Sequence, residues 1–169
     1  MKWLTRFTGG LLERVFGLTL ALCTAQFPVY FSAYCNTLAG AQLEAQTRYQ
    51  ELAREAARIP LSVNAFIQRH ESNADAVFRA SGRIHRTTIE RYERFTAMQA
   101  ALTSAPLWAR PWVLSQNFDR TLHQATGFKP GLPLSAEGGA YAMVGLLVAW
   151  LLSSLLGWLL TPKLRTTVA

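Results

Sequence analysis

The sequence predicts an all-α membrane protein, in which two transmembrane helices flank a helical extramembrane domain. Two long uncharged apolar segments lie near the ends of the chain, the region between them is rich in helix-forming residues, and the outer flanks are basic. The expected order is a tail (residues 1–14), a first span (15–34), an extramembrane domain (35–139), a second span (140–160) and a second tail (161–169).

The net charge of +7 does not indicate a nucleic-acid surface. Residues 35–139 carry twelve basic and nine acidic side chains, which is close to balance. Binding to nucleic acid needs a concentrated basic patch or stripe, and the remaining cations flank the apolar segments instead. We therefore expect the lipid bilayer, and no nucleic acid, as a partner. These flanking cations are Lys2, Arg6, Arg14, Lys163 and Arg165.

The first span is predicted over Val15–Tyr34, twenty residues without a charge. A helix needs about that length to cross roughly 30 Å of hydrocarbon. The alternative is a cleaved signal peptide, with a basic start, an apolar stretch to Leu22 and small residues at Cys23 and Ala25. The apolar run continues through Phe31, which a signal peptide does not require, so we expect the segment to be retained.

The middle of the chain predicts three helices, separated by proline or glycine: Leu38–Arg58, Leu61–His70 and Arg83–Ser104. Pro60 is expected to end the first helix, and Gly82 to separate the third from a turn capped by Asn73 or Asp75. The apolar faces of the two long helices are predicted from residues that recur at helical spacing. These are Leu43, Thr47, Leu52 and Ala56 in the first, and Ile84, Thr88, Tyr92, Phe95, Met98 and Leu102 in the last.

Trp108 and Trp112 lie one helical turn apart in a short apolar segment after Pro106. Tryptophan at a membrane surface buries its ring and keeps its N–H hydrated, so both residues are candidate membrane-interface anchors. The alternative is that both rings complete the core of the small domain. The proline- and glycine-rich residues that follow lead to Ser135, a candidate N-cap for the second span.

The second span is predicted over Ala140–Leu160, which is also uncharged. Lys163 and Arg165 follow it closely and are candidate interface anchors. Short basic flanks stay in the cytoplasm, whereas long loops cross the membrane largely regardless of their charge. We therefore expect a bacterial inner-membrane protein with both termini in the cytoplasm and residues 35–139 in the periplasm.

Small residues recur along one face of each predicted span, where they let another helix approach closely. We expect these faces to form a helix-packing interface, either within one chain or between chains. The face of the first span is Gly17, Ala21 and Ala25, and that of the second is Gly145, Ala149, Ser153 and Gly157.

Gln26 and Pro28 place a polar amide and a helix-kinking residue near the middle of the first span. An amide in hydrocarbon needs a polar partner. Contact with the second span, with another copy or with a different membrane protein would supply it. The alternative is a local bond to backbone that Pro28 leaves unpaired.

The chain resembles an uncharacterised family of small two-span bacterial inner-membrane proteins, a domain-of-unknown-function family. The likeness rests on Ala25-Gln26-Phe27-Pro28 before the long helix from Leu43, and on two motifs near the second span: Phe128-Lys129-Pro130-Gly131-Leu132-Pro133-Leu134-Ser135-Ala136-Glu137-Gly138 and Val144-Gly145-Leu146-Leu147. The resemblance implies the same two-span layout and no known activity.

No spacing of residues predicts catalysis, a metal site or a cofactor, so we expect a non-enzyme. The three histidines, His70, His85 and His123, have unrelated spacings, and Cys23 and Cys35 lack the paired spacing of a metal or redox motif. The chain also has no glycine-rich phosphate loop and no nucleophile elbow.

Two functional hypotheses remain. The first is a structural or accessory subunit that assembles through its spans, as a homo-oligomer or in a larger membrane complex, and presents a periplasmic docking domain. The second is a ligand- or lipid-binding module at the periplasmic membrane surface, with an apolar pocket beside Trp108 and Trp112. An apolar cavity at those tryptophans favours the second hypothesis, and a continuous contact face between helices favours the first. A channel is disfavoured because the spans offer few polar side chains to line a path.

Overall fold

The computed structural model describes the backbone of residues 2–131 and 135–160, and the side chains of residues 13–131 and 135–156. Every element in this part of the chain is helical, which confirms the all-α prediction. The elements are α1 (Lys2–Arg58), α2 (Val63–Glu71), α3 (Ala76–Ser104), the 3-10 helix η1 (Leu107–Ala109), α4 (Arg110–Gln116), α5 (Arg120–Ala125) and α6 (Ala136–Leu160).

The chain forms two compact units, and α1 contributes to both. The span unit comprises residues 1–30 and 128–169, and the hairpin unit comprises residues 31–127. Within the described residues, two helices are long and apolar enough to cross a membrane, and they are α1 from Glu13 onward and α6. The predicted pair of candidate spans is therefore present.

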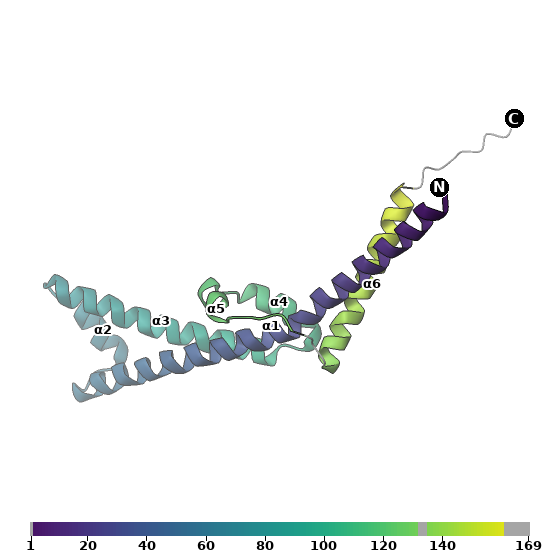
Figure 1. The fold of residues 1–169 in the computed structure, drawn as a ribbon. Coiled ribbons are helices and arrows are strands. Elements are labelled where there is room, and N and C mark those ends of the chain that lie inside the picture. The colour runs from purple at the N-terminus through teal and green to yellow at the C-terminus, as the bar shows by residue number, and fades with distance from the viewer. Residues whose placement is uncertain (1, 132–134, 161–169) are drawn as a thin grey trace. The chain divides into compact units, whose positions relative to one another are not determined.

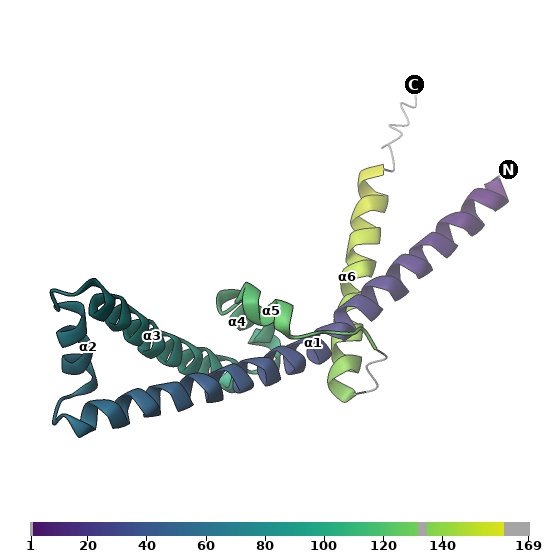
Figure 2. The ribbon, with the colours of Figure 1, turned by 60° about the vertical axis from the view of Figure 1, so that its left-hand side comes forward.

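In the span unit, the first part of α1 and α6 run in opposite directions, so that their outer ends lie at the same end of the unit (Figures 1 and 2). Ser135 precedes α6, and its Oγ accepts a hydrogen bond from the backbone N–H of Gly138 at 3.0 Å. This bond satisfies one of the free N–H groups of the first turn and confirms Ser135 as the N-cap.

In the hairpin unit, α3 returns alongside the second part of α1, and α2 lies across the end where these two helices diverge (Figures 1 and 2). α1 ends at Arg58, just before Pro60, as predicted. The predicted short helix is α2, which begins two residues later than expected. Its N-cap is Ser62, whose Oγ accepts from the N–H of Ala65 at 3.2 Å.

The prediction that Gly82 interrupts the chain is wrong, because α3 begins at Ala76 and runs through it. Asp75 caps this start by accepting a hydrogen bond from the N–H of Val77 at 2.8 Å. A Cβ at Gly82 would lie 2.7 Å from Cγ of Glu71 and 2.8 Å from its backbone N. The glycine therefore serves close packing of α2 on α3, and it does not break the helix.

The core of the hairpin unit uses only part of the apolar faces predicted from spacing. Leu52 and Ala56 are buried as expected, whereas Leu43 is 65% exposed. Nine residues separate Leu43 from Leu52, which places them on opposite sides of a helix with 3.6 residues per turn. The buried residues of α1 in this unit are Phe31, Tyr34, Leu38, Ala45, Leu52 and Ala56.

The α3 face is correct toward the end of that helix and wrong near its start. Phe95, Met98 and Leu102 are buried, whereas Ile84 is 66% exposed. Ile84 lines the cavity of about 370 Å³ that Leu52 of α1 and Phe66 of α2 also line, so its side chain faces open space instead of a packed helix. A prediction from residue spacing assumes that another helix packs along the whole length of α3. Near Ile84 this packing is incomplete.

Gly82 and Gly40 give a paired test of this packing. Gly82→Ala is expected to destabilise the α2 end of the hairpin, since overpacking costs roughly 1–3 kcal/mol and exceeds the gain in helix propensity of about 1 kcal/mol. Gly40→Ala is expected to be stabilising, because a Cβ there meets nothing within 4 Å. Hydrogen exchange of the α2 amides should accelerate in the first variant only. Equal changes in the two variants would contradict the assignment.

Candidate functional site

The two helices of the span unit approach each other closely at Gly145 of α6. A Cβ built there would overlap Oγ1 of Thr24 and lie 2.9 Å from both Cα of Ala21 and the backbone oxygen of Leu20. The backbones of α1 and α6 therefore touch directly, which only glycine permits at this position.

The structure brings the small residues of both predicted faces together within one chain. Ala21, Ala25 and Ala149 are each less than a tenth exposed, and Gly17 and Gly145 are also buried. Ser153 is half-buried. The surroundings of Gly157 at the end of α6, and both Lys163 and Arg165, lie outside the described residues.

Thr24 belongs to this contact, although spacing alone did not single it out. Its Oγ1 donates within α1, where the backbone oxygens of Leu20 and Ala21 lie 2.9 and 3.0 Å away. Because the hydroxyl is satisfied locally, Thr24 offers α6 a compact contact without an unpaired polar group.

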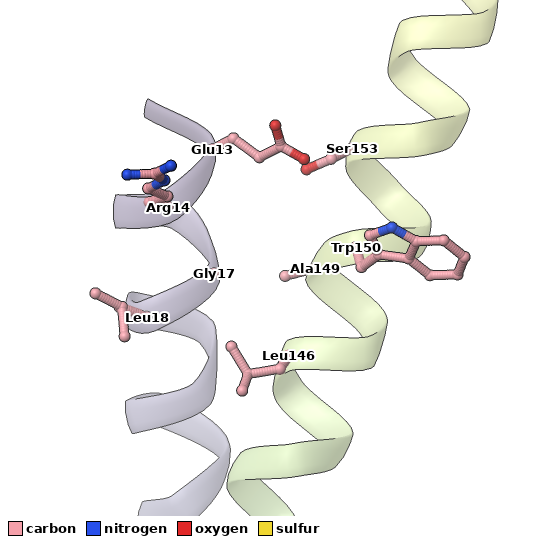
Figure 3. Close-up of a pocket in the computed structure, with 8 residues that line it drawn as sticks. All are labelled: Glu13, Arg14, Gly17, Leu18, Leu146, Ala149, Trp150 and Ser153. Carbon is pink, nitrogen blue, oxygen red and sulfur yellow. The ribbon is translucent and has the colours of Figure 1, made fainter. Parts of the chain in front are cut away.

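Farther along the span unit, α1 and α6 separate around an open cavity of about 570 Å³. Figure 3 shows the side chain of Glu13 reaching across from α1 toward Ser153, with Ala149 also directed into the gap. Arg14 and Leu18 point away from α6. Glu13 was expected in the N-terminal tail, but α1 is helical there, and the carboxylate faces the other span.

Gln26 has a partner that neither sequence-based alternative named. Its Nε2 donates to the backbone oxygen of Gly131 at 2.7 Å, and its Oε1 accepts from the N–H of Gly131 at 3.1 Å. The backbone N–H and C=O of a single residue in the segment before α6 thus satisfy the amide. Pro28 is buried within α1, two residues farther on.

Two aromatic pairs join the same segments of the chain as the hydrogen bonds between Gln26 and Gly131. The ring centroids of Phe27 and Tyr141 lie 5.2 Å apart, and those of Tyr30 and Phe128 lie 5.4 Å apart in an edge-to-face arrangement. Such pairs add roughly 0.5–1.5 kcal/mol each beyond the burial of their area. They fasten α1 to both the start of α6 and the segment that precedes it.

Outside their contact face, both candidate spans expose large apolar side chains. Trp150, Leu18 and Met143 are each at least 60% exposed. Apolar exposure on this scale is a liability in water and is favourable in hydrocarbon. The surface of the span unit therefore matches the membrane prediction.

Trp108 and Trp112 are 84% and 69% exposed, so the alternative that they complete the core is wrong. Leu114 is the residue of α4 that is buried. Both indole rings therefore face outward. Their role as membrane-interface anchors stays a prediction.

Tyr34 joins three helices at the base of the hairpin unit, and sequence analysis did not detect it. The side chain is fully buried; its hydroxyl donates to the backbone oxygen of Asn117 at 3.0 Å and accepts from the N–H of Asp119 at 2.9 Å. Asp119 in turn caps α5 and pairs with Arg94 of α3 at 3.0 Å. The phenol thus fixes the junction of α4 and α5 to α1.

At the other end of the hairpin unit, two cavities flank Phe66 of α2. The larger, about 620 Å³, is also lined by His70, and the smaller, about 370 Å³, by His85. The two imidazole rings meet edge to face with centroids 5.6 Å apart. Nδ1 of His70 donates to the backbone oxygen of Phe66 at 2.9 Å, since a carbonyl can only accept.

Burial lowers the pKa of His85, and the neighbouring His70 lowers it further. The unfolded chain therefore binds the proton more tightly, and stability decreases as the pH falls from about 6.5 toward the lower folded pKa. We expect hydrogen exchange of α2 to accelerate on acidification through this range. His85→Phe should flatten that dependence, and His123→Gln, outside the cluster, should retain it. A His85→Phe protein with unchanged pH dependence would contradict this assignment.

Within the described residues, no group of three or more His, Cys, Asp or Glu side chains could hold a metal ion. No curated protein and no solved structure matches the chain. A family model described as "Protein of unknown function (DUF2937)" matches residues 9–166. Since this match covers nearly the whole sequence and confirms the resemblance to an uncharacterised family, the chain belongs to the DUF2937 family.

Proposed function

We propose that this chain is a non-enzymatic accessory protein of the bacterial inner membrane. The paired α1 and α6 hold it in the bilayer, both termini lie in the cytoplasm, and residues 35–139 form a periplasmic docking domain. The single observation that carries the proposal is the direct backbone contact at Gly145, because it packs α1 against α6 at this point. With that face used inside the chain, the outward apolar surfaces of α1 and α6 remain for lipid and for assembly.

The opposed directions of α1 and α6 support the topology. Two antiparallel spans return the chain to the side from which it started, and short basic flanks favour the cytoplasm for that side. Reporter fusions test this topology directly. A fusion near Asp75 should be active only with a periplasmic reporter, and a fusion after residue 169 only with a cytoplasmic one. A cytoplasmic reporter active near Asp75 would overturn the topology.

The mass of the complex released gently from its own membrane tests the accessory role. Native mass spectrometry should show either a whole multiple of the single chain, as for a homo-oligomer, or this chain together with a larger membrane complex. A monomer at every detergent concentration, with no other chain retained, would contradict assembly.

A second candidate function is a lipid-binding module at the periplasmic membrane surface. The outward position of Trp108 and Trp112 favours it, because indole is enriched at headgroup depth. The cavities described above are lined by other side chains, so a pocket beside the tryptophans has no support. In a variant whose only tryptophan is Trp108, lipids brominated near the headgroup should quench the fluorescence. Absence of quenching would exclude this placement.

A further inference from the structure

The larger cavity beside α2 has one apolar wall. It lies between the end of α1, α2 and the start of α3, and its volume of about 620 Å³ falls within the usual range of small-molecule sites. Ile59 and Phe78 line this cavity, and they are 51% and 49% exposed to solvent. The apolar lining consists of Ile59, Leu61, Phe66 and Phe78.

Aromatic contacts fix this wall in place. The ring of His70 lies 4.4 Å from that of Phe66 and 6.0 Å from that of Phe78, measured between centroids. The bond from His70 to the backbone of Phe66 holds the imidazole on α2. Because these contacts within the protein fix the wall, binding would cost little ordering of side chains.

The polar rim of the cavity carries an excess of positive charge. Glu55 is neutralised by Arg58, whose Nη1 lies 2.9 Å from its Oε1. Arg69 lines the same rim and forms no ion pair with any carboxylate that the structure describes. The surrounding residues 54–86 hold six arginines against three carboxylates.

We propose that this cavity binds a single-chain amphiphile with an anionic head group. The acyl chain lies against Phe66 and Phe78, and the head group pairs with Arg69, whose planar guanidinium matches the two oxygens of a carboxylate or the oxygens of a phosphate. Charge complementarity selects an anion over a cation. The concave shape selects one molecule over a flat bilayer surface. This site goes beyond the docking role and does not depend on the compartment in which the domain lies.

Photolabelling of the full chain tests the site. The protein, in nanodiscs of zwitterionic lipid, is exposed to a dodecanoate that carries a diazirine on its chain, and the labelled peptides are identified by mass spectrometry. Labelling of residues 55–78 should be saturable by unlabelled dodecanoate. Labelling of residues 15–34 of α1 and of α6 should depend on the lipid, and unlabelled dodecanoate should not reduce it. Labelling of residues 55–78 that unlabelled dodecanoate does not reduce would overturn the proposal.

Variants separate the cavity from general attraction to a basic surface. Arg69→Glu should weaken competition by dodecanoate roughly tenfold, since a hydrogen-bonded charge pair is lost. Arg54→Glu makes the same charge change one turn from Arg58, outside the cavity lining, and should stay within about twofold of the unaltered chain. Equal weakening by the two variants would show nonspecific electrostatics and reject the site.

The head group and the wall need separate controls. Dodecyltrimethylammonium should compete at least about tenfold less well than dodecanoate, because its cation meets Arg69. Phe78→Ser should weaken competition by a similar factor, through the loss of apolar contact. A cationic competitor as effective as dodecanoate would refute the anionic preference. Competition by phosphatidylglycerol vesicles but not by monomeric dodecanoate would show adsorption to a surface, and would also refute the proposal.

Discussion

Gly145→Leu is expected to separate α1 from α6 where their backbones touch. The new side chain would meet the hydroxyl of Thr24 and the backbone of Ala21 and Leu20, and these two backbone groups cannot move without displacing the helix. Overpacking of this kind lies at the upper end of its usual range, about 3 kcal/mol or more. Spin labels at positions 18 and 150, in a background without Cys23 and Cys35, would report a longer and broader distance distribution.

Gly139→Leu is the matched control for this experiment. Gly139 lies in the first turn of the same helix, and a Cβ there meets nothing within 4 Å. The distance distribution of this variant should coincide with that of the unaltered chain. If Gly145→Leu also left the distribution unchanged, the contact between α1 and α6 would not have the geometry described above.

Tyr34→Ala is expected to detach α4 and α5 from the hairpin unit. Removing a buried aromatic ring costs about 3–5 kcal/mol, and the N–H of Asp119 also loses its acceptor. Amides of residues 110–125 should lose protection from hydrogen exchange, while those of α2 keep theirs. The measurement can be made on the full chain in detergent.

Tyr34→Phe distinguishes the hydroxyl from the ring. It keeps the packing and removes both hydrogen bonds, so an intermediate loss of about 1–3 kcal/mol is expected. Tyr49→Phe is the control, because that ring stacks on Tyr92 at 4.7 Å and the stack survives without the hydroxyl. If Tyr34→Phe behaved like Tyr49→Phe, the two hydrogen bonds would contribute nothing measurable to the junction.

The elements that sequence predicts well are those decided by properties of consecutive residues. Long uncharged runs identify both candidate spans, and Ser135 is recognisable as a cap from its position before an apolar helix. The small-residue faces could be read in the same way, because a stripe on one helix is a local pattern. Whether the two stripes met within one chain was a matter of tertiary structure, and spacing could not decide it.

The features that sequence missed depend on what lies opposite a residue. Gly82 looks like a helix breaker in the chain, and only the presence of Glu71 beside it explains a helical glycine. Leu43 and Leu52 are equally apolar, and the position of α3 decides which one is buried. Tyr34 binds backbone groups more than eighty residues away, and backbone groups leave no signature in side-chain patterns.

The pairing of Gln26 with Gly131 has a consequence for the order of assembly during synthesis. The two residues are 105 positions apart, and a ribosome needs on the order of 5–20 s to make that length at about 5–20 residues per second. The hairpin unit lies between them and can fold meanwhile from contacts nearer in sequence. Throughout that interval Gln26 and the small-residue face of α1 lack their native partners, so a chaperone or another helix has seconds to bind α1 before those partners are synthesised.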